Sequence, residues 1–240
     1  GDREAYVQPG RRLTFAEWNR AADGIAAAFA EAGVRPGDVV ALLMPSSIDY
    51  ALCYQAAMRV RAIATGINTR LGPAEIASIL ERTSPRVLVR DDALAVDAGQ
   101  AQIVARSELA GFETRPPLAP GPVEARDLVA IVWTSGTTGM PKGATFDHDN
   151  LAAVAQGAGE LGAPFDRRVS PLPFAHVAYM SRAYEEIGKA ITTVIPATPW
   201  KAGEMLALMD AERVTVGQGV PTQWRLMLDH PDFGATDLSA

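Results

Sequence analysis

Short continuous apolar runs alternate along this chain with segments in which apolar residues recur at helical spacing. In the first such segment Thr14 and Glu17 precede the apolar series, a spacing that is typical of a capping box at the start of a helix. Gly33 is predicted to end that helix. The runs predict strands at 39–43, 62–65, 86–89, 128–133, 169–172, 191–195 and 214–220, and the helical spacing predicts helices that begin near residues 14, 45, 73, 150, 181, 201 and 222.

This alternation predicts an α/β fold with mainly parallel sheets flanked by helices. One stretch interrupts it, because Arg115–Pro122 is rich in proline, which suits neither a helix interior nor a central strand. We therefore predict a first α/β subdomain over residues 1–115, a proline-rich connector over 116–126, and a second α/β subdomain over 127–240.

Composition narrows the class of protein. With 240 residues, 48% of them hydrophobic and 21% charged, the chain is predicted to fold around a large core. No apolar run has the length of a membrane span. A net charge of -6 provides no broad basic surface for nucleic acid. Cys53 is the only cysteine, which rules out an intrachain disulfide framework, and the first residues show no signal peptide, so a cytoplasmic location is expected.

Hydroxyl groups, glycines and one cation follow the apolar run at 128–133. Glycine lets backbone amides approach an anion closely, hydroxyls can donate to phosphate oxygens or contact Mg²⁺, and a lysine adds positive charge. Open α/β sheets bind ligands at the carboxyl ends of their strands, where this loop would lie. The residues expected to bind phosphate are Thr134, Ser135, Gly136, Thr137, Thr138, Gly139 and Lys142, and Thr138 is also a candidate contact for Mg²⁺.

The position and spacing of this loop argue against two other interpretations. A flexible linker of the same composition has no reason to lie between an apolar strand and the helix start predicted at Asp149 to Leu151. A Walker A loop requires four residues between its glycine and the Gly-Lys pair, whereas Gly139 precedes Lys142 by three and Gly143 follows it. An ordinary P-loop nucleoside triphosphatase is therefore excluded.

The stretch Trp133–Gly143 resembles the phosphate-loop signature of the adenylate-forming (AMP-binding) superfamily, which contains acyl-CoA and aryl-CoA ligases, nonribosomal peptide adenylation domains and luciferases. Other segments resemble the same family in the same order, so that the resemblance covers nearly the whole chain. These segments are Leu13–Glu17, Gly33–Ala41, Ile67–Leu71, Pro171–His176 and Gly219–Thr222.

The resemblance implies a two-step reaction. A carboxylate attacks the α-phosphate of ATP to form an acyl-adenylate and pyrophosphate, and a thiol then displaces AMP. The implied cofactors are ATP, Mg²⁺ and coenzyme A, and the implied partners are a small-molecule carboxylic acid and the CoA thiol. Residues of the acyl-substrate pocket are expected at His176, Tyr179, Gln218 and Gly219, although spacing alone also allows a structural role for His176.

The family's downstream motifs, including the ribose-binding aspartate and the C-terminal catalytic lysine, have no counterpart in these residues. We therefore expect the N-terminal part of an acid–thiol ligase, with its C-terminal domain missing in cis and with little or no adenylation activity on its own. The alternatives are a nonribosomal-peptide-type adenylation domain and a noncatalytic nucleotide-binding module.

Overall fold

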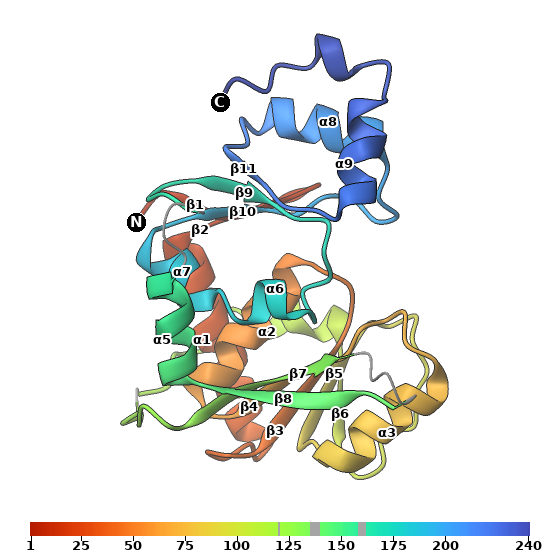
Figure 1. Cartoon of the computed structure of the whole chain (residues 1–240). Coiled ribbons are helices and arrows are strands. Elements are labelled where there is room, and N and C mark those ends of the chain that lie inside the picture. Colours follow the sequence, from red (N-terminus) through yellow and green to blue (C-terminus); the bar gives the residue numbers. More distant parts are fainter. Residues whose placement is uncertain (120, 135–139, 158–161) are drawn as a thin grey trace.

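The computed structural model describes residues 1–119, 121–134, 140–157 and 162–240. These residues form two sheets with helices between them and on their outer faces (Figure 1). The predicted α/β class with mainly parallel sheets is confirmed, because most neighbouring strands run parallel.

The six-stranded sheet has the order β6-β5-β3-β4-β7-β8, and only β8 runs antiparallel to its neighbour. Its parallel strands end on one edge, which is where loops of α/β proteins bind ligands. The strands are β3 (Val39–Leu43), β4 (Ile63–Gly66), β5 (Val87–Arg90), β6 (Gln102–Ala105), β7 (Leu128–Thr134) and β8 (Lys142–Asp147).

The five-stranded sheet has the order β11-β9-β10-β1-β2, with β1 and β2 forming an antiparallel hairpin at one side. Gly10 takes a φ of +79° in the turn of that hairpin, a conformation that glycine adopts readily. The strands are β1 (Glu4–Gln8), β2 (Arg11–Thr14), β9 (Arg167–Val169), β10 (Thr192–Val194) and β11 (Val216–Gly217).

Most helices begin where their sequence signals predict. Thr14 caps the first helix, and the reciprocal bonds of Thr14 and Glu17 confirm the capping box. Ser47 caps the second helix, and Pro73 is the first residue of the third. The helices are α1 (Phe15–Glu31), α2 (Ile48–Arg59), α3 (Pro73–Thr83), α4 (Leu109–Phe112), α5 (His148–Gly157), α6 (Val177–Met180), α7 (Ala183–Gly188), α8 (Ala202–Ala211) and α9 (Pro221–Leu228), with short 3₁₀ turns at Arg106–Glu108 and Phe233–Ala235.

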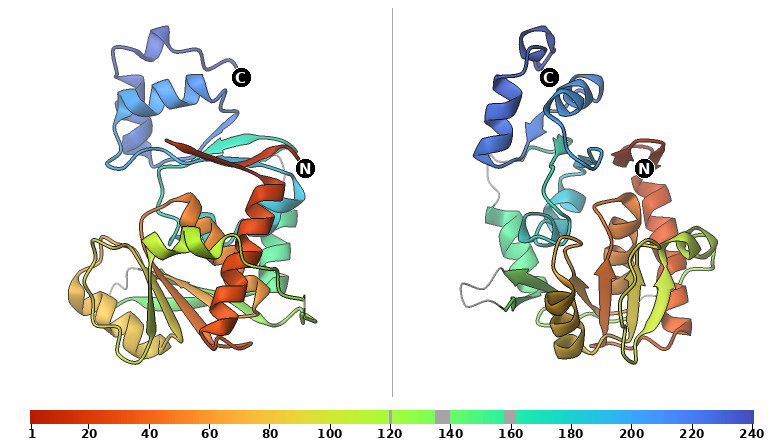
Figure 2. Two further views of the ribbon diagram at one scale, coloured as in Figure 1. Left: turned by 180° about the vertical axis from the view of Figure 1, so that it is seen from behind. Right: turned by 90° about the vertical axis from the view of Figure 1, so that its right-hand side faces the viewer.

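The core is layered (Figures 1 and 2). Helices α1 and α2 fill the space between the two sheets, α3 covers the outer face of the six-stranded sheet, and α8 and α9 cover the outer face of the other. Strand β3 contributes to two of these layers, because successive side chains of a strand point to opposite faces. Val40 and Leu42 face the layer between the sheets, whereas Ala41 and Leu43 face α3. This strand is buried on both faces, as its continuous apolar run indicates.

Four strands were not predicted from the sequence, namely β1, β2, β6 and β8. Strand β8 shows the reason, because it lies at the edge of its sheet and the side chains from Lys142 to Thr145 are exposed. The sequence Lys-Gly-Ala-Thr therefore shows no apolar alternation.

The predicted division into residues 1–115 and 127–240 does not coincide with the sheets. Strands β1 and β2, from the first unit, pair with strands of the second, and β7 and β8 complete the sheet of the first unit. In the described part of the chain, no helix is both long enough and apolar enough to cross a membrane.

Candidate functional site

The predicted phosphate loop leaves the carboxyl end of β7. Val129, Ala130 and Val132 are buried and hold this strand in the sheet, while Thr134 at its end is exposed. Ser135, Gly136, Thr137, Thr138 and Gly139 lie outside the described residues. The structure therefore places the two ends of the loop, at Thr134 and Lys142.

The chain returns from this loop as strand β8, not directly as a helix. Lys142 is the first residue of β8 and lies opposite Thr134 in the ladder, where the Thr134 hydroxyl donates to the Lys142 carbonyl at 3.3 Å. The backbone position of Lys142 is thus set by strand pairing. Its side chain is exposed and has no ion-pair partner among the described residues, which leaves the ammonium group available to an anion.

The helix after β8, α5, begins at His148, close to the start predicted at Asp149 to Leu151. Asp147 accepts from the Asn150 amide at 2.8 Å, and the Asn150 side chain accepts from the Asp147 amide at 3.1 Å. This reciprocal pair caps the start of α5. Helix α5 follows the strand directly, because β8 ends at Asp147.

Trp133 fixes the base of the hairpin to the middle of the sheet. Its indole nitrogen donates to the Thr65 hydroxyl of β4 at 2.7 Å. Gly143, its partner across the ladder, has no side chain, and a Cβ there would lie 2.8 Å from Ile131 and 3.3 Å from the Trp133 ring. The glycine that closes the loop motif therefore makes room for the Trp133 ring.

A second segment, residues 170–181, lies at the same edge of the six-stranded sheet. The Phe174 amide donates to the Ser46 hydroxyl, just beyond β3, at 2.9 Å, and α6 contacts β7. At the carboxyl end of β4, a Cβ on Gly66 would lie 2.9 Å from the Ala175 Cα atom. The phosphate-loop hairpin and the predicted acyl-pocket motif are therefore neighbours in space.

His176 lies on the surface of this segment and begins α6. Its Nδ1 accepts from the Ala178 amide at 3.3 Å, so one ring nitrogen performs a local capping role. The exposed ring remains accessible to a ligand. Among the described residues, no group of three or more His, Cys, Asp or Glu side chains could hold a metal ion.

Tyr179 lies in the core, and its side chain is directed away from the surface that exposes His176. Its ring stacks on Phe174 with centroids 3.7 Å apart, and its hydroxyl lies 3.0 Å from that of Tyr6. Burial raises the pKa of the Tyr179 hydroxyl well above its ordinary value. Tyr179 therefore packs beneath the predicted acyl-pocket motif, against Phe174.

Gln218 and Gly219 follow β11, and the Gln218 amide donates to the Val169 carbonyl of β9 at 2.9 Å. Strands β9 and β11 are parallel neighbours, so their carboxyl ends lie at the same edge of the five-stranded sheet. Residues 218–219 leave the sheet at that edge, and so does the segment that leads from β9 to His176. A Cβ on Gly219 would lie 3.3 Å from the Trp224 indole nitrogen. The structure therefore gives this glycine a packing role as well.

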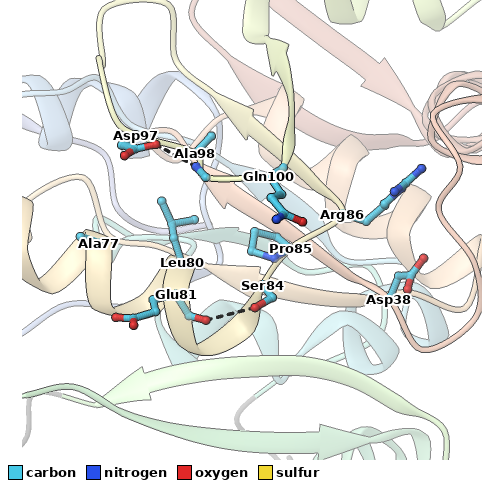
Figure 3. Close-up of a pocket in the computed structure, with 12 residues that line it drawn as sticks. Asp38, Ala77, Leu80, Glu81, Ser84, Pro85, Arg86, Asp97, Ala98 and Gln100 are labelled. Carbon is cyan, nitrogen blue, oxygen red and sulfur yellow. Dashed lines mark hydrogen bonds between the residues drawn. The ribbon is translucent and has the colours of Figure 1, made fainter.

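One groove of about 650 Å³ lies at the opposite, amino end of the six-stranded sheet (Figure 3). Asp38 precedes β3, and Pro85 and Arg86 precede β5, so the groove lies away from the carboxyl edge. The groove is also unsuited to a triphosphate, because its lining carries the negative charges of Asp38, Glu81 and Asp97. The carboxyl edge is the better candidate for the functional site.

Comparison with known proteins identifies the family of this chain. The family described as AMP-binding enzyme matches residues 1–240. The chain is 32% identical over 252 residues to the long-chain-fatty-acid–CoA ligase FadD13 of Mycobacterium tuberculosis, covering 98% of this chain and 50% of FadD13. It is also 32% identical to a feruloyl-CoA synthase of Amycolatopsis sp, covering 96% of this chain and 48% of the synthase.

Solved structures show the same similarity. The N-terminal domain of FACL13 from Mycobacterium tuberculosis superposes with a TM-score of 0.89 at 28% identity, covering 99% of this chain and 64% of that domain. ATP-bound MatB from Rhodopseudomonas palustris has a TM-score of 0.85 at 26% identity, covering 96% of this chain and 48% of MatB. The chain spans about half the length of the curated relatives that it matches. The family match, the fold and the loop hairpin lead to one conclusion: the chain belongs to the AMP-binding enzyme family.

Proposed function

We propose that this chain forms the N-terminal half of an ATP-dependent acid–thiol ligase that makes an acyl-adenylate and then an acyl-CoA thioester. The observation that carries the proposal is the meeting of two elements at one sheet edge. The phosphate-loop hairpin, with Lys142, lies beside the segment that carries His176. A triphosphate and a carboxylic acid could therefore be held next to each other.

In the first step, a carboxylate oxygen of the acid forms a bond to the α-phosphorus of ATP, and the bond from that phosphorus to the bridging oxygen breaks. Pyrophosphate leaves with the electron pair. The exposed ammonium of Lys142 would bind the β- and γ-phosphates and stabilise the leaving group. The Thr134 hydroxyl would join it by exchanging its 3.3 Å bond to the Lys142 carbonyl for one to a phosphate oxygen. The loop residues from Ser135 to Gly139, outside the described residues, are proposed to complete this cradle.

Mg²⁺ usually retains water and phosphate ligands and takes only one or two protein oxygens, so it requires no metal cage in the protein. When bound, it would neutralise phosphate charge, and Thr138 is the residue proposed to contact it. The pocket for the acid is proposed to include His176, Gln218 and Gly219, with Tyr179 as support behind Phe174. These residues would orient the carboxylate for attack.

In the second step, the sulfur of a thiol, having released its proton to solvent, forms a bond to the acyl carbon. The bond from that carbon to the phosphate oxygen breaks, and AMP leaves with the electron pair. Coenzyme A is the proposed thiol because two relatives are named as a fatty-acid–CoA ligase and a feruloyl-CoA synthase. A cytoplasmic location is also proposed, supported by the buried free thiol of Cys53, the only cysteine.

The test is an acid screen on the full-length protein by ATP–pyrophosphate exchange. Long-chain fatty acids, arylpropenoic acids and amino acids would be compared, followed by thioester formation with CoA or with a carrier protein. We expect exchange with a fatty or arylpropenoic acid and a CoA product. Exchange with amino acids and transfer to a carrier protein would favour the peptide-synthetase alternative, and no exchange with any acid would contradict the ligase proposal.

A Lys142→Ala variant connects this activity to the loop. Removing a charged donor to phosphate should raise the KM for ATP by roughly ten- to a hundredfold, since charge-assisted hydrogen bonds contribute about 1.5–3 kcal/mol. Lys201→Ala is the matched control, because Lys201 is an exposed lysine at the start of α8 that pairs with Glu204. Equal ATP kinetics in both variants would contradict the assignment of Lys142.

A further inference from the structure

Arg82 is a residue that the phosphate-loop motif does not include. It lies in the last turn of α3, far from the loop in sequence. Helix α3 is held against the six-stranded sheet by Ile76, Ile79 and Leu80, which pack on β3 and β5. The helix therefore offers a rigid base from which the Arg82 side chain can reach neighbouring elements.

The Arg82 side chain contacts both sides of the hairpin. Its Nη1 donates to the carbonyl of Pro141 at 2.7 Å, and its guanidinium carbon lies 5.0 Å from the centroid of the Trp133 ring. Trp133 is the second-last residue of β7, and Pro141 immediately precedes Lys142. One guanidinium thus bridges the strand that enters the loop and the residue that leaves it. Figure 1 shows α3 beside the start of β8.

These contacts suit an arginine in particular. A planar guanidinium can lie over an aromatic ring and still donate to a carbonyl, whereas a lysine ammonium cannot do both in the same way. Pro141 is buried, so its carbonyl gains from a protein donor. Trp133 is itself held by Thr65, so Arg82 connects Pro141 to a fixed ring.

A simpler explanation is that Arg82 only stabilises the end of its own helix, where a cation is favourable. That explanation does not account for the direction of the side chain toward Pro141 and Trp133. Among the described residues Arg82 also has no carboxylate partner, so no ion pair accounts for its orientation.

We propose that Arg82 is a positioning residue for ATP binding, which holds the base of the β7–β8 hairpin so that Lys142 meets the triphosphate. This inference rests on the proposed function of the loop. Arg82 acts through Pro141 and Trp133 and does not itself touch the nucleotide. Its loss should therefore weaken ATP binding and leave the acid pocket unaffected.

The test compares Arg82→Ala, Arg82→Lys and wild type in the full-length protein, with steady-state kinetics in ATP and in the acid and with a thermal unfolding midpoint for each variant. Arg82→Ala should raise the KM for ATP by about three- to tenfold, less than the loss of Lys142 itself because Arg82 acts only through the hairpin, and leave the KM for the acid unchanged. Arg82→Lys should recover part of the loss because it keeps a donor. Arg20→Ala is the charge-matched control, since Arg20 is exposed on α1 and away from the hairpin.

An unchanged KM for ATP in Arg82→Ala, with wild type active, would overturn the role of Arg82 and leave the ligase function intact. An equal rise in the KM for the acid would also overturn the role of Arg82, because that result would mean that the substitution disturbs the whole structure and not the ATP site in particular. If Arg82→Ala fails to fold, Arg82→Lys takes its place. A rise in the KM for ATP without a rise in the KM for the acid then supports the role of Arg82, and no such difference overturns it. Wild-type protein without acid-dependent exchange would instead overturn the proposed function, and the inference about Arg82 with it.

Discussion

At the scale of single residues, a buried polar cluster lies behind the predicted acyl-pocket motif. Arg168 of β9 and Glu185 of α7 form an almost fully buried ion pair at 2.9 Å. The next residue, Glu186, accepts from the Tyr6 hydroxyl at 3.4 Å, and Tyr6 in turn is hydrogen-bonded to Tyr179. The motif is therefore connected to a buried carboxyl group.

Burial raises the pKa of Glu186 from 4.5 to about 7, and the neighbouring positive charge of Arg168 opposes part of that rise. A carboxyl whose pKa is higher in the folded state binds its proton more tightly there. Its stabilising contribution is full below pH 4.5 and is lost as the pH rises through about 7. The difference between the two values corresponds to about 3 kcal/mol.

Glu186→Gln should remove this pH dependence, because the amide cannot ionise. Relative to wild type, the variant's free energy of unfolding should rise by about 3 kcal/mol between pH 4.5 and pH 8. Urea unfolding of Glu186→Gln and of wild type at several pH values measures this difference in the free energy of unfolding. Glu81→Gln, the same substitution at an exposed position on α3, is the matched control. A difference between Glu186→Gln and wild type that stays constant with pH would show that Glu186 does not titrate in this range.

At the scale of elements, the site depends on how closely residues 173–181 approach the carboxyl end of β4. Tyr54 donates to the Met180 carbonyl at 2.6 Å, and a Cβ at Gly66 would lie 2.8 Å from the Met180 sulfur. The backbone of Ala175 is equally close to Gly66. This close approach leaves no space for a side chain on Gly66.

Gly66→Ala should therefore displace the acyl-pocket motif and lower the free energy of unfolding by about 1–3 kcal/mol, the usual cost of overpacking. Denaturant unfolding measures the stability, and the KM for the acid in the full-length protein reports the displacement. Gly111→Ala is the matched control, because a Cβ there meets no atom within 4 Å. Equal behaviour of the two variants would mean that the motif does not depend on this contact.

Element prediction from the sequence succeeded where burial is two-sided or a cap is strong. The run Val39–Leu43 matches β3, and the Thr14–Glu17 pair marks the start of α1. It failed at β8, because an exposed edge strand needs no apolar face. The β1–β2 hairpin had a usable signal, since Pro9-Gly10 follows a short apolar run.

At the scale of the whole molecule, the chain crosses between the two sheets more than once. The β1–β2 hairpin joins a sheet that is otherwise formed by residues 167–217, and β7–β8 completes the other sheet after the proline-rich stretch. Both sheets share the packed layer that contains α1 and α2. The two sheets therefore form one interlocked body in which neither half of the sequence is complete alone.

The 240-residue chain by itself is expected to show little or no acid-dependent pyrophosphate release, compared with the full-length protein. The reason is that it spans about half of its relatives, and the resemblance assigns the ribose contact and the catalytic lysine to later motifs. A coupled pyrophosphate assay with the best acid measures this difference. Robust turnover by the chain alone would contradict it, and circular dichroism would confirm that the tested chain is folded.

The sequence by itself determined the α/β class, most strands and helices, and the phosphate-loop motif, because these depend on local periodicity, capping and spacing. Only the tertiary structure decided which of those elements meet. It placed the segment that carries His176 beside β7, buried Tyr179 against Phe174 and directed Arg82 toward Pro141. Such contacts join residues far apart along the chain, and they arise from strand order and helix packing, which no local pattern contains.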